Sequence, residues 1–356
     1  MAERSKIQSG GDDRSREILR LIVRTYIGSG EPVGSRTLSR LIERALSPAT
    51  IRNIMADLEA EGYLTHPHTS AGRVPTELAY RAYVDSLGGA ARPTPSAEAY
   101  MNEALARAES VEELMSTACY LLSDISRNVG IVISPPIEIS TLRHIEFIRV
   151  DEDKILVIFV SQSGLLQKKL IRVRESYSQE ELARAGNYLC ERFLGRTLPE
   201  IRRELLDMMS EERMLYDRMM QDLLRSWSLS LEDSVEPASD SVYIHGTGNI
   251  LGQADPSDLA QLEELFRLFE EKGRLIKILN ECLPPDVVEQ DRVRIMIGSE
   301  LNNPAMRGFT VITSPYLQAE GGAGFVGIIG PTRMQYRRGI SVVGYLAGVF
   351  SRRMGA

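Results

Sequence analysis

The sequence has little of what disulfide-stapled domains, metal sites and membrane proteins are built from. Its 356 residues include four histidines and three cysteines. The cysteines, Cys119, Cys190 and Cys282, are scattered and odd in number, which fits neither a disulfide framework nor a paired zinc site. No run approaches the roughly 20 apolar residues that span a bilayer, and the polar N-terminus lacks the apolar centre of a signal peptide. We therefore expect a cytoplasmic protein with reduced thiols.

A recognisable catalytic arrangement is also missing. No Ser/His/Asp, Cys/His or paired-carboxylate pattern stands out, and four histidines give little acid–base capacity. Two glycine clusters, at 246–248 and 321–324, match no phosphate-binding fingerprint and are interpreted as turns between strands. We expect neither an enzyme nor a bound cofactor.

The charge is unevenly distributed along the chain. The net charge of −7 argues against a protein coated in basic residues. Residues 1–88 nevertheless hold 12 Lys plus Arg against 11 Asp plus Glu, so the acidic excess belongs to the rest of the chain. Eleven of these 12 cations are arginine, whose planar guanidinium suits phosphate and guanine.

Apolar side chains with helical spacing predict three helices in the first 62 residues. The first helix carries a stripe of Leu19, Ile22, Val23, Tyr26 and Ile27. The segment 28–34 interrupts the pattern, and a second, short helix begins near Ser35. The third begins where Ser47 can cap the helix and Pro48 takes the first helical position, and Gly62 ends it.

A turn-rich segment and a fourth helix complete the N-terminal unit. Residues 65–75 contain two prolines and a glycine and are interpreted as a β-ribbon, or wing. A helical stripe follows at 80–87, before a linker at 89–96. Residues 13–88, after a polar tail at 1–12, are therefore predicted to form a winged helix-turn-helix.

The third helix has a second stripe that suits a DNA groove. Ala49, Arg52, Asn53 and Ala56 lie opposite the apolar stripe, so two groove-reading side chains stand between two small ones. Arginine can pair with guanine and asparagine with adenine, each discriminating by about 1–3 kcal/mol. We expect this helix to enter the groove by its N-terminal half.

Other residues of the unit are expected to position it on the DNA backbone. The start of the second helix favours a phosphate, and the wing offers further donors. The predicted DNA-binding residues are Ser35, Arg36, Thr37, Ala49, Thr50, Arg52, Asn53, His66, His68, Ser70 and Arg73. Metal binding by His66 and His68 is disfavoured, because no Cys or carboxylate stands at ligand spacing.

The rest of the chain predicts an α+β sensor-like domain that carries an insertion. Residues 97–128 look helical, and strand-like runs follow at 145–150, 154–160 and 165–173. The middle run is apolar after Lys154, which predicts burial on both faces. A helical pattern then fills about 176–231. The strands and helices expected beyond it are 241–245, 257–280, 293–298, 309–314, 325–329 and 335–352.

The helical segment contains five methionines between 208 and 220. Methionine repacks easily, so this segment could be a partner surface, an internal core or a dimer seam. Its leucines and single tryptophan favour a dimer contact, with candidates Leu205, Met209, Leu215, Met219, Leu223 and Trp227.

Long motifs near both ends of the chain carry a resemblance to a known family. They are LSPATIRNIMADLEAEGYL at 46–64, HPHTSAGRVPT at 66–76, YRAYVD at 80–85 and GIIGPTRMQY at 327–336. Together they resemble the heat-inducible transcription repressor family HrcA, over nearly the whole chain.

The resemblance implies more than the patterns do. It implies a dimeric repressor of chaperone operons, an inverted-repeat operator called CIRCE, and upkeep of the active form by the GroEL chaperonin. It also implies a GAF-like domain at 97–173 and 240–356, with a dimerisation domain inserted at 174–239. Two alternatives remain, a winged-helix repressor controlled by a small ligand or metal, and a protein-docking module.

Overall fold

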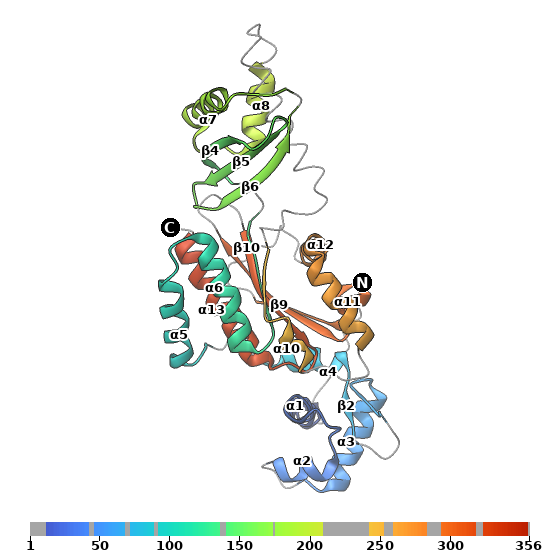
Figure 1. Ribbon diagram of the computed structural model, residues 1–356. Coiled ribbons are helices and arrows are strands. Elements are labelled where there is room, and N and C mark those ends of the chain that lie inside the picture. Colours follow the sequence, from blue (N-terminus) through green and yellow to red (C-terminus); the bar gives the residue numbers. More distant parts are fainter. Residues whose placement is uncertain are drawn as a thin grey trace.

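Three units follow one another through the molecule. The computed structural model describes residues 12–42, 46–67, 72–88, 92–135, 140–173, 175–208, 242–252, 259–282, 293–317 and 323–354. In Figure 1 the N-terminal unit lies at the bottom, a sheet domain in the centre and an inserted unit at the top. Across these ranges, none of the helices has the length and apolar character to cross a bilayer.

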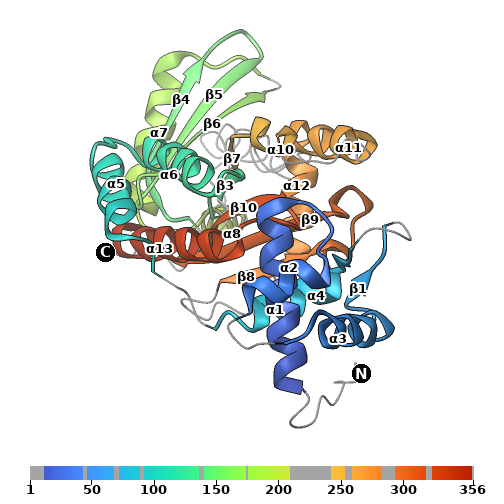
Figure 2. The same ribbon diagram turned by 90° about the horizontal axis from the view of Figure 1, so that it is seen from below.

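The N-terminal unit has the layout of a winged helix. Its elements are α1 (Asp12–Ser29), α2 (Ser35–Leu41), α3 (Pro48–Ala60), β1 (Leu64–Thr65), β2 (Val74–Pro75) and α4 (Glu77–Asp85). The predicted signals act as expected, because Pro48 opens α3 and Gly62 follows its end with a φ of +82°. Figure 2 looks onto this unit, with α1 crossing in front of α4 and α3 beside it.

The central domain is a three-layer α/β/α arrangement. Its antiparallel sheet has the order β7-β3-β10-β9-β8. The strands are β3 (Val129–Ile133), β7 (Val242–His245), β8 (Arg294–Ile297), β9 (Phe309–Leu317) and β10 (Ala323–Pro331). One face packs on α6 (Val111–Ser126) and α13 (Tyr336–Met354), with α5 (Pro95–Ala106) outside α6.

The opposite face of the sheet is covered by two further helices. They are α11 (Leu259–Glu270) and α12 (Lys272–Cys282), and short helical turns α10 (Gly248–Leu251), η4 (Gly298–Leu301) and η5 (Pro304–Met306) complete the domain. Side chains alternate between the two cores along each strand. Val132 belongs to the α6/α13 side, whereas Ile131 and Ile133 belong to the α11/α12 side. The mixed α+β class expected from the sequence is confirmed.

The sequence analysis missed β3. All five of its residues are buried, and it lies inside the sheet between β7 and β10. The preceding helical pattern runs almost directly into it, with only Arg127 and Asn128 between α6 and β3. Arg127 ends the helix with a φ of +60°. Glycine is the usual residue in this left-handed conformation, so an arginine here gives no sequence signal for the helix end.

The inserted unit has its own sheet and its own core. Antiparallel strands β4 (Leu142–Arg149), β5 (Lys154–Ser161) and β6 (Leu166–Arg172) form it, and α7 (Gln179–Phe193) and α8 (Leu198–Met208) follow. Phe147, Phe159, Leu182 and Phe193 are buried together in a core separate from those of the central sheet. The sequence analysis placed the strands at 142–172 in the same domain as the central sheet. They instead form a separate sheet.

The insertion consequently starts earlier than position 174. It leaves the central sheet at the end of β3 and returns at β7, its antiparallel neighbour, where Ile133 pairs with Val242. The sequence pattern of a strand shows that the segment is a strand, but not which sheet it joins. The expected start of the insertion was therefore placed after β6.

Strand β5 also differs from expectation. Its burial alternates strictly, with Ile155, Val157 and Phe159 inside. The intervening Leu156, Ile158 and Val160 are half-buried on the other face. The strand is apolar on both faces but fully buried on one, so the prediction of burial on both faces was wrong.

The predicted dimer contacts fall outside what the structure describes. Residues 209–241, which hold Met209, Leu215, Met219, Leu223 and Trp227, are not among the described ranges. Leu205 lies on α8, and its side chain is likewise outside the description. The dimer contact therefore stays a prediction.

Glycine substitutions test the close packing of α6 on β3. A Cβ on Gly130 would lie 2.2 Å from the carbonyl oxygen of Cys119 on α6. We expect Gly130→Ala to lower the free energy of unfolding by about 2–3 kcal/mol, because helix and strand must separate. Urea unfolding followed by circular dichroism measures it.

Gly348→Ala is the matched control. This glycine is inside α13, and the nearest atom to an added Cβ is the flexible end of Arg352 at 3.4 Å. Alanine favours the helix, so we expect a gain of about 0.5–1 kcal/mol. A shift of both variants in the same direction would contradict the packing argument.

Candidate nucleic-acid interface

Helix α3 presents two different faces. Ile51, Met55 and Leu58 are buried against the rest of the unit. The opposite stripe, Ala49, Arg52, Asn53 and Ala56, is exposed, as is Thr50. The structure thus brings five predicted groove-facing side chains together on one free helix surface, on the described part of the chain.

The start of α3 is fixed by local hydrogen bonds. The Ser47 hydroxyl accepts from the backbone N–H of Thr50 at 3.1 Å and lies 2.9 Å from the Thr50 hydroxyl. This is the N-cap expected from the sequence. Because the cap ties down Thr50, the first turn of the helix is held in a defined position beside Arg52 and Asn53.

The start of α2 lies in the same unit and is capped differently. Its N-cap, Gly34, has no side chain to satisfy the first helical amides. Arg36 and Thr37 are exposed there and Ser35 is half-buried. This end of α2 can therefore offer backbone donors and a guanidinium to one phosphate.

The wing is anchored to the turn between α1 and α2. Strands β1 and β2 pair as Leu64 with Pro75 and Thr65 with Val74. Val33 and Arg73 exchange two backbone hydrogen bonds of 2.9 Å, which adds a third chain to the ribbon. A Cβ on Gly72 would be 2.4 Å from the Val33 carbonyl oxygen, so only glycine permits this approach.

Two of the predicted wing contacts are bound to α3. Glu59, on α3, forms an ion pair with Arg73 at 2.8 Å and a hydrogen bond with His66 Nδ1. Arg73 donates in turn to His66 Nε2. The three side chains therefore form a continuous chain from helix to wing.

We call Glu59, His66 and Arg73 the wing clasp. The sequence analysis assigned His66 and Arg73 to DNA and passed over Glu59. The Glu59 carboxylate, both His66 ring nitrogens and the two Arg73 Nη atoms bond to one another, so they hold the wing against α3. The spacing of Glu59 gives no hint of this, because its partners lie across a turn whose path the sequence leaves open.

Two other predicted wing residues cannot be placed. His68 and Ser70 fall within 68–71, outside the described residues.

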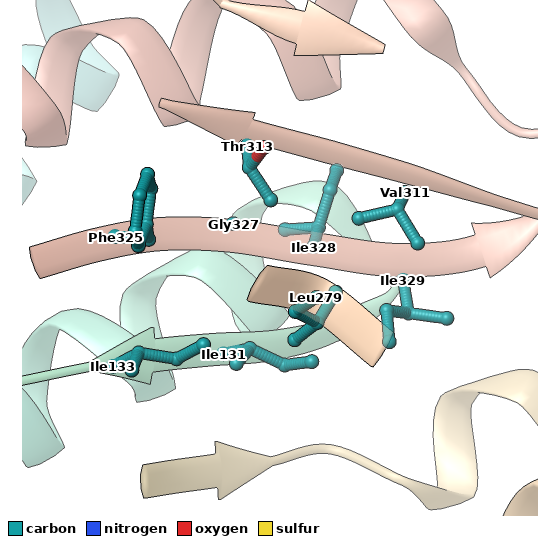
Figure 3. A pocket seen from close by; sticks show the side chains of 9 residues that line it. All are labelled: Ile131, Ile133, Leu279, Val311, Thr313, Phe325, Gly327, Ile328 and Ile329. Atoms are coloured by element: carbon teal, nitrogen blue, oxygen red, sulfur yellow. The ribbon is translucent and has the colours of Figure 1, made fainter. Parts of the chain in front are cut away.

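A metal site gains no support from the described residues. These ranges contain no group of three His, Cys, Asp or Glu side chains that could hold a metal ion. One cavity lies between the sheet and α12, with Ile131, Leu279, Val311 and Ile329 pointing into it (Figure 3). Its volume is about 10 Å³, enough for about one water, and Thr313 is its one hydroxyl-bearing lining residue. This cavity does not favour the ligand-controlled alternative.

Comparison with known proteins identifies the family. A family model described as the HrcA protein C-terminal domain matches residues 112–340. The heat-inducible transcription repressor HrcA of Geobacter sulfurreducens is 41% identical over 341 residues, covering 96% of this chain and 97% of that protein. The chain belongs to the HrcA family.

Other HrcA proteins and one solved structure agree. The heat-inducible transcription repressor HrcA of Xanthomonas oryzae pv. oryzae is 38% identical over 343 residues, with 96% of each chain covered. A crystal structure of a hypothetical protein has a TM-score of 0.61 at 23% identity, covering 96% of this chain and 98% of its own, and thus shares the fold. The named HrcA relatives are repressors and not enzymes, which confirms that expectation from the sequence.

Neutralising Glu59 tests the wing clasp. Side chains of Glu59 and Arg73 are 29% and 18% exposed, so their ion pair is only partly screened. We expect Glu59→Gln to lower the free energy of opening of the wing by about 1 kcal/mol. Hydrogen exchange at the Val33 and Arg73 amides should then be about fivefold faster.

Glu61→Gln supplies the control, because it removes the same charge two residues further along the same helix end. In Glu61→Gln the hydrogen-exchange rate at the Val33 and Arg73 amides should stay unchanged. Equal acceleration in both variants would show that net charge, and not the clasp, sets the stability of the wing.

Proposed function

We propose that this chain is a heat-inducible transcription repressor that binds the inverted-repeat operator CIRCE as a homodimer. The observation that carries the proposal is the exposed Arg52/Asn53 surface of α3, in a winged-helix unit of an HrcA-family chain. Binding at such an operator blocks transcription of chaperone genes, and it places the protein in the cytoplasm with its DNA.

The α3 surface suits direct reading of bases. Ala49 and Ala56 leave room for the helix to approach base edges, and Arg52 and Asn53 have the donors and acceptors for guanine and adenine. Neither residue lies in the wing clasp, so both remain available to DNA. The acidic Asp57 and Glu59 follow in the second half of the helix, which supports entry by the N-terminal half.

The remaining predicted contacts divide by role. Ser35, Arg36 and Thr37 bind a phosphate and fix the register on the duplex without reading sequence. His66 and Arg73 hold the wing, and His68 and Ser70 stay predicted contacts with the DNA backbone.

A two-fold operator calls for a two-fold protein. The inserted unit supplies the contact between protomers. Besides the methionine-rich segment, its sheet carries Leu156, Ile158 and Val160 on the face away from α7, all half-buried. An apolar surface of this kind supports association with a second copy.

Heat inactivation is proposed on the family resemblance. Raised temperature shifts the dimer toward a form that cannot bind the operator. The GroEL chaperonin restores the active form, so that repression follows the supply of free chaperonin.

Binding by the wild-type protein tests the function directly. Duplexes carrying the inverted repeat and a scrambled sequence should differ in affinity by at least about 10³-fold. Affinity should fall steeply with salt because phosphate contacts release counterions, and added chaperonin should raise the bound fraction. Equal, weak binding of a folded dimer to both duplexes would contradict the proposal.

Substitutions separate the reading residues from the positioning residue. Arg52→Ala and Asn53→Ala should each reduce discrimination between operator and scrambled DNA by about 1–3 kcal/mol. Arg36→Ala should weaken binding to both duplexes about equally. It should also lower the slope of log affinity against log salt concentration by about one. Fluorescence anisotropy at several salt concentrations measures all three.

Arg107→Ala is the charge-matched control. Its side chain is 76% exposed on the sheet domain, and its removal should leave both affinities unchanged. Unaltered specific binding by Arg52→Ala at matched salt would show that α3 is not the recognition helix.

A further inference from the structure

Helix α4 joins the winged-helix unit to the sheet domain through its polar side chains. Glu77 and Arg81 are one turn apart on α4, and both reach η4, the short turn after β8. The Glu77 carboxylate accepts hydrogen bonds from the Ser299 N–H at 3.1 Å and the Ser299 hydroxyl at 2.6 Å. These atoms are more than 200 residues apart in sequence, so the contact is wholly tertiary.

The backbone of η4 is shaped to receive this carboxylate. Gly298 has a φ of +53°, which glycine adopts without strain. A Cβ at this position would lie 1.7 Å from Glu77 Oε1. The carboxylate therefore occupies the space that any other residue would fill.

Arg81 forms the most directional bonds of the contact. Its Nε donates to Glu300 Oε1 at 2.8 Å and its Nη2 to the Ile295 carbonyl at 2.7 Å. Nη2 also bonds the second Glu300 oxygen, which accepts from the Ile297 N–H at 2.8 Å. A two-pronged guanidinium–carboxylate pair of this kind fixes orientation as well as distance.

The environment of Arg81 keeps it charged. Burial lowers the pKa of the guanidinium, but the hydrogen bond and charge of Glu300 outweigh burial and raise it above its ordinary value. Asp85, at 3.6 Å, adds to the same effect.

Aromatic rings close the contact on its apolar side. Tyr80 and Tyr83 of α4 lie with ring centroids 6.0 and 6.3 Å from Tyr336, at the start of α13. Tyr80 and Tyr336 belong to an apolar cluster that runs from the winged helix into the sheet domain. Arg333 lies so near Gly30, just past the end of α1, that a Cβ there would be 2.1 Å from Nη1.

We propose that Arg81, through its pair with Glu300, is a positioning residue that sets the angle between the winged helix and the sheet domain. We call the bonds from Glu77 to Ser299 and from Arg81 to Glu300 and Ile295 the α4 contact. The inference rests on the proposed function, because its role is to place two recognition helices on two half-sites of one operator.

The physical reason is effective concentration. Once one winged helix of a dimer is bound, the second finds its half-site at a rate set by how well its orientation is held. A loosened α4 contact spreads that orientation over many angles. Binding to two half-sites then weakens, whereas binding to one half-site does not change.

The experiment compares two duplexes and four proteins. One duplex carries the full inverted repeat and the other a single half-site. The proteins are wild type, Arg81→Met, Glu300→Gln and the double variant. Methionine keeps the apolar stem of arginine and removes its bonds.

We expect each single variant to lose about tenfold in affinity for the full repeat and less than twofold for the half-site. The affinity of the double variant for the full repeat should be no lower than that of the weaker-binding single variant, because both changes break the same ion pair. A matched pair of variants at the exposed Arg107–Glu103 ion pair should behave as wild type.

Three results would overturn the inference. They are unchanged affinity for the full repeat, tighter binding to it, and an equal loss on both duplexes, which would assign Arg81 to stability of the winged helix alone. Failure of the wild type to prefer the full repeat over scrambled DNA would instead overturn the proposed function.

A distance measurement tests the same inference without DNA. Spin labels are attached to cysteines introduced at the exposed Ala60 and Ala99, with Cys190 and Cys282 replaced by serine. Cys119 can stay, because burial raises its pKa to about 12. Labelled chains are diluted with unlabelled ones. Arg81→Met should broaden a narrow distance distribution, and an unchanged distribution would overturn the inference.

Discussion

The central sheet depends on burial of both its faces, and the rest of the molecule depends on that sheet. Along β3 and β10 successive side chains enter two separate cores, one under α6 and α13 and the other under α11 and α12. Gly130 lets α6 approach β3 more closely than any other residue would. The first core then continues without a break into the winged helix, so this N-terminal unit shares its apolar interior with the sheet domain.

This continuity changes how the winged helix should be regarded. A reading module on a flexible linker would find each half-site independently. Here α4 is attached to η4 and to the first residues of α13 by charged, hydroxyl and aromatic groups. Helix α3, the wing clasp and the α4 contact form one series of tertiary contacts from the exposed face of α3 to the sheet.

Local signals in the sequence were enough to predict helix α3 and its ends, whereas contacts between residues far apart in the sequence could not be predicted. Ser47, Pro48 and Gly62 mark the ends of α3 through bonds made within a few residues, so its exposed face followed from spacing alone. Glu59 and Arg81 act on partners that only the folded chain brings near, and neither has a distinctive neighbourhood in sequence. The inserted sheet was misassigned for the same reason, because alternation identifies a strand and not its partner.

The inserted unit leaves and rejoins the central sheet at two residues that face each other, Ile133 and Val242. For the sheet, everything between them is equivalent to a long hairpin loop, and lengthening such a loop costs little free energy. The insert has its own core, so its sequence can drift without altering the register of β3 and β7. In evolution, the inserted unit and the winged helix can therefore diverge at separate rates within one chain.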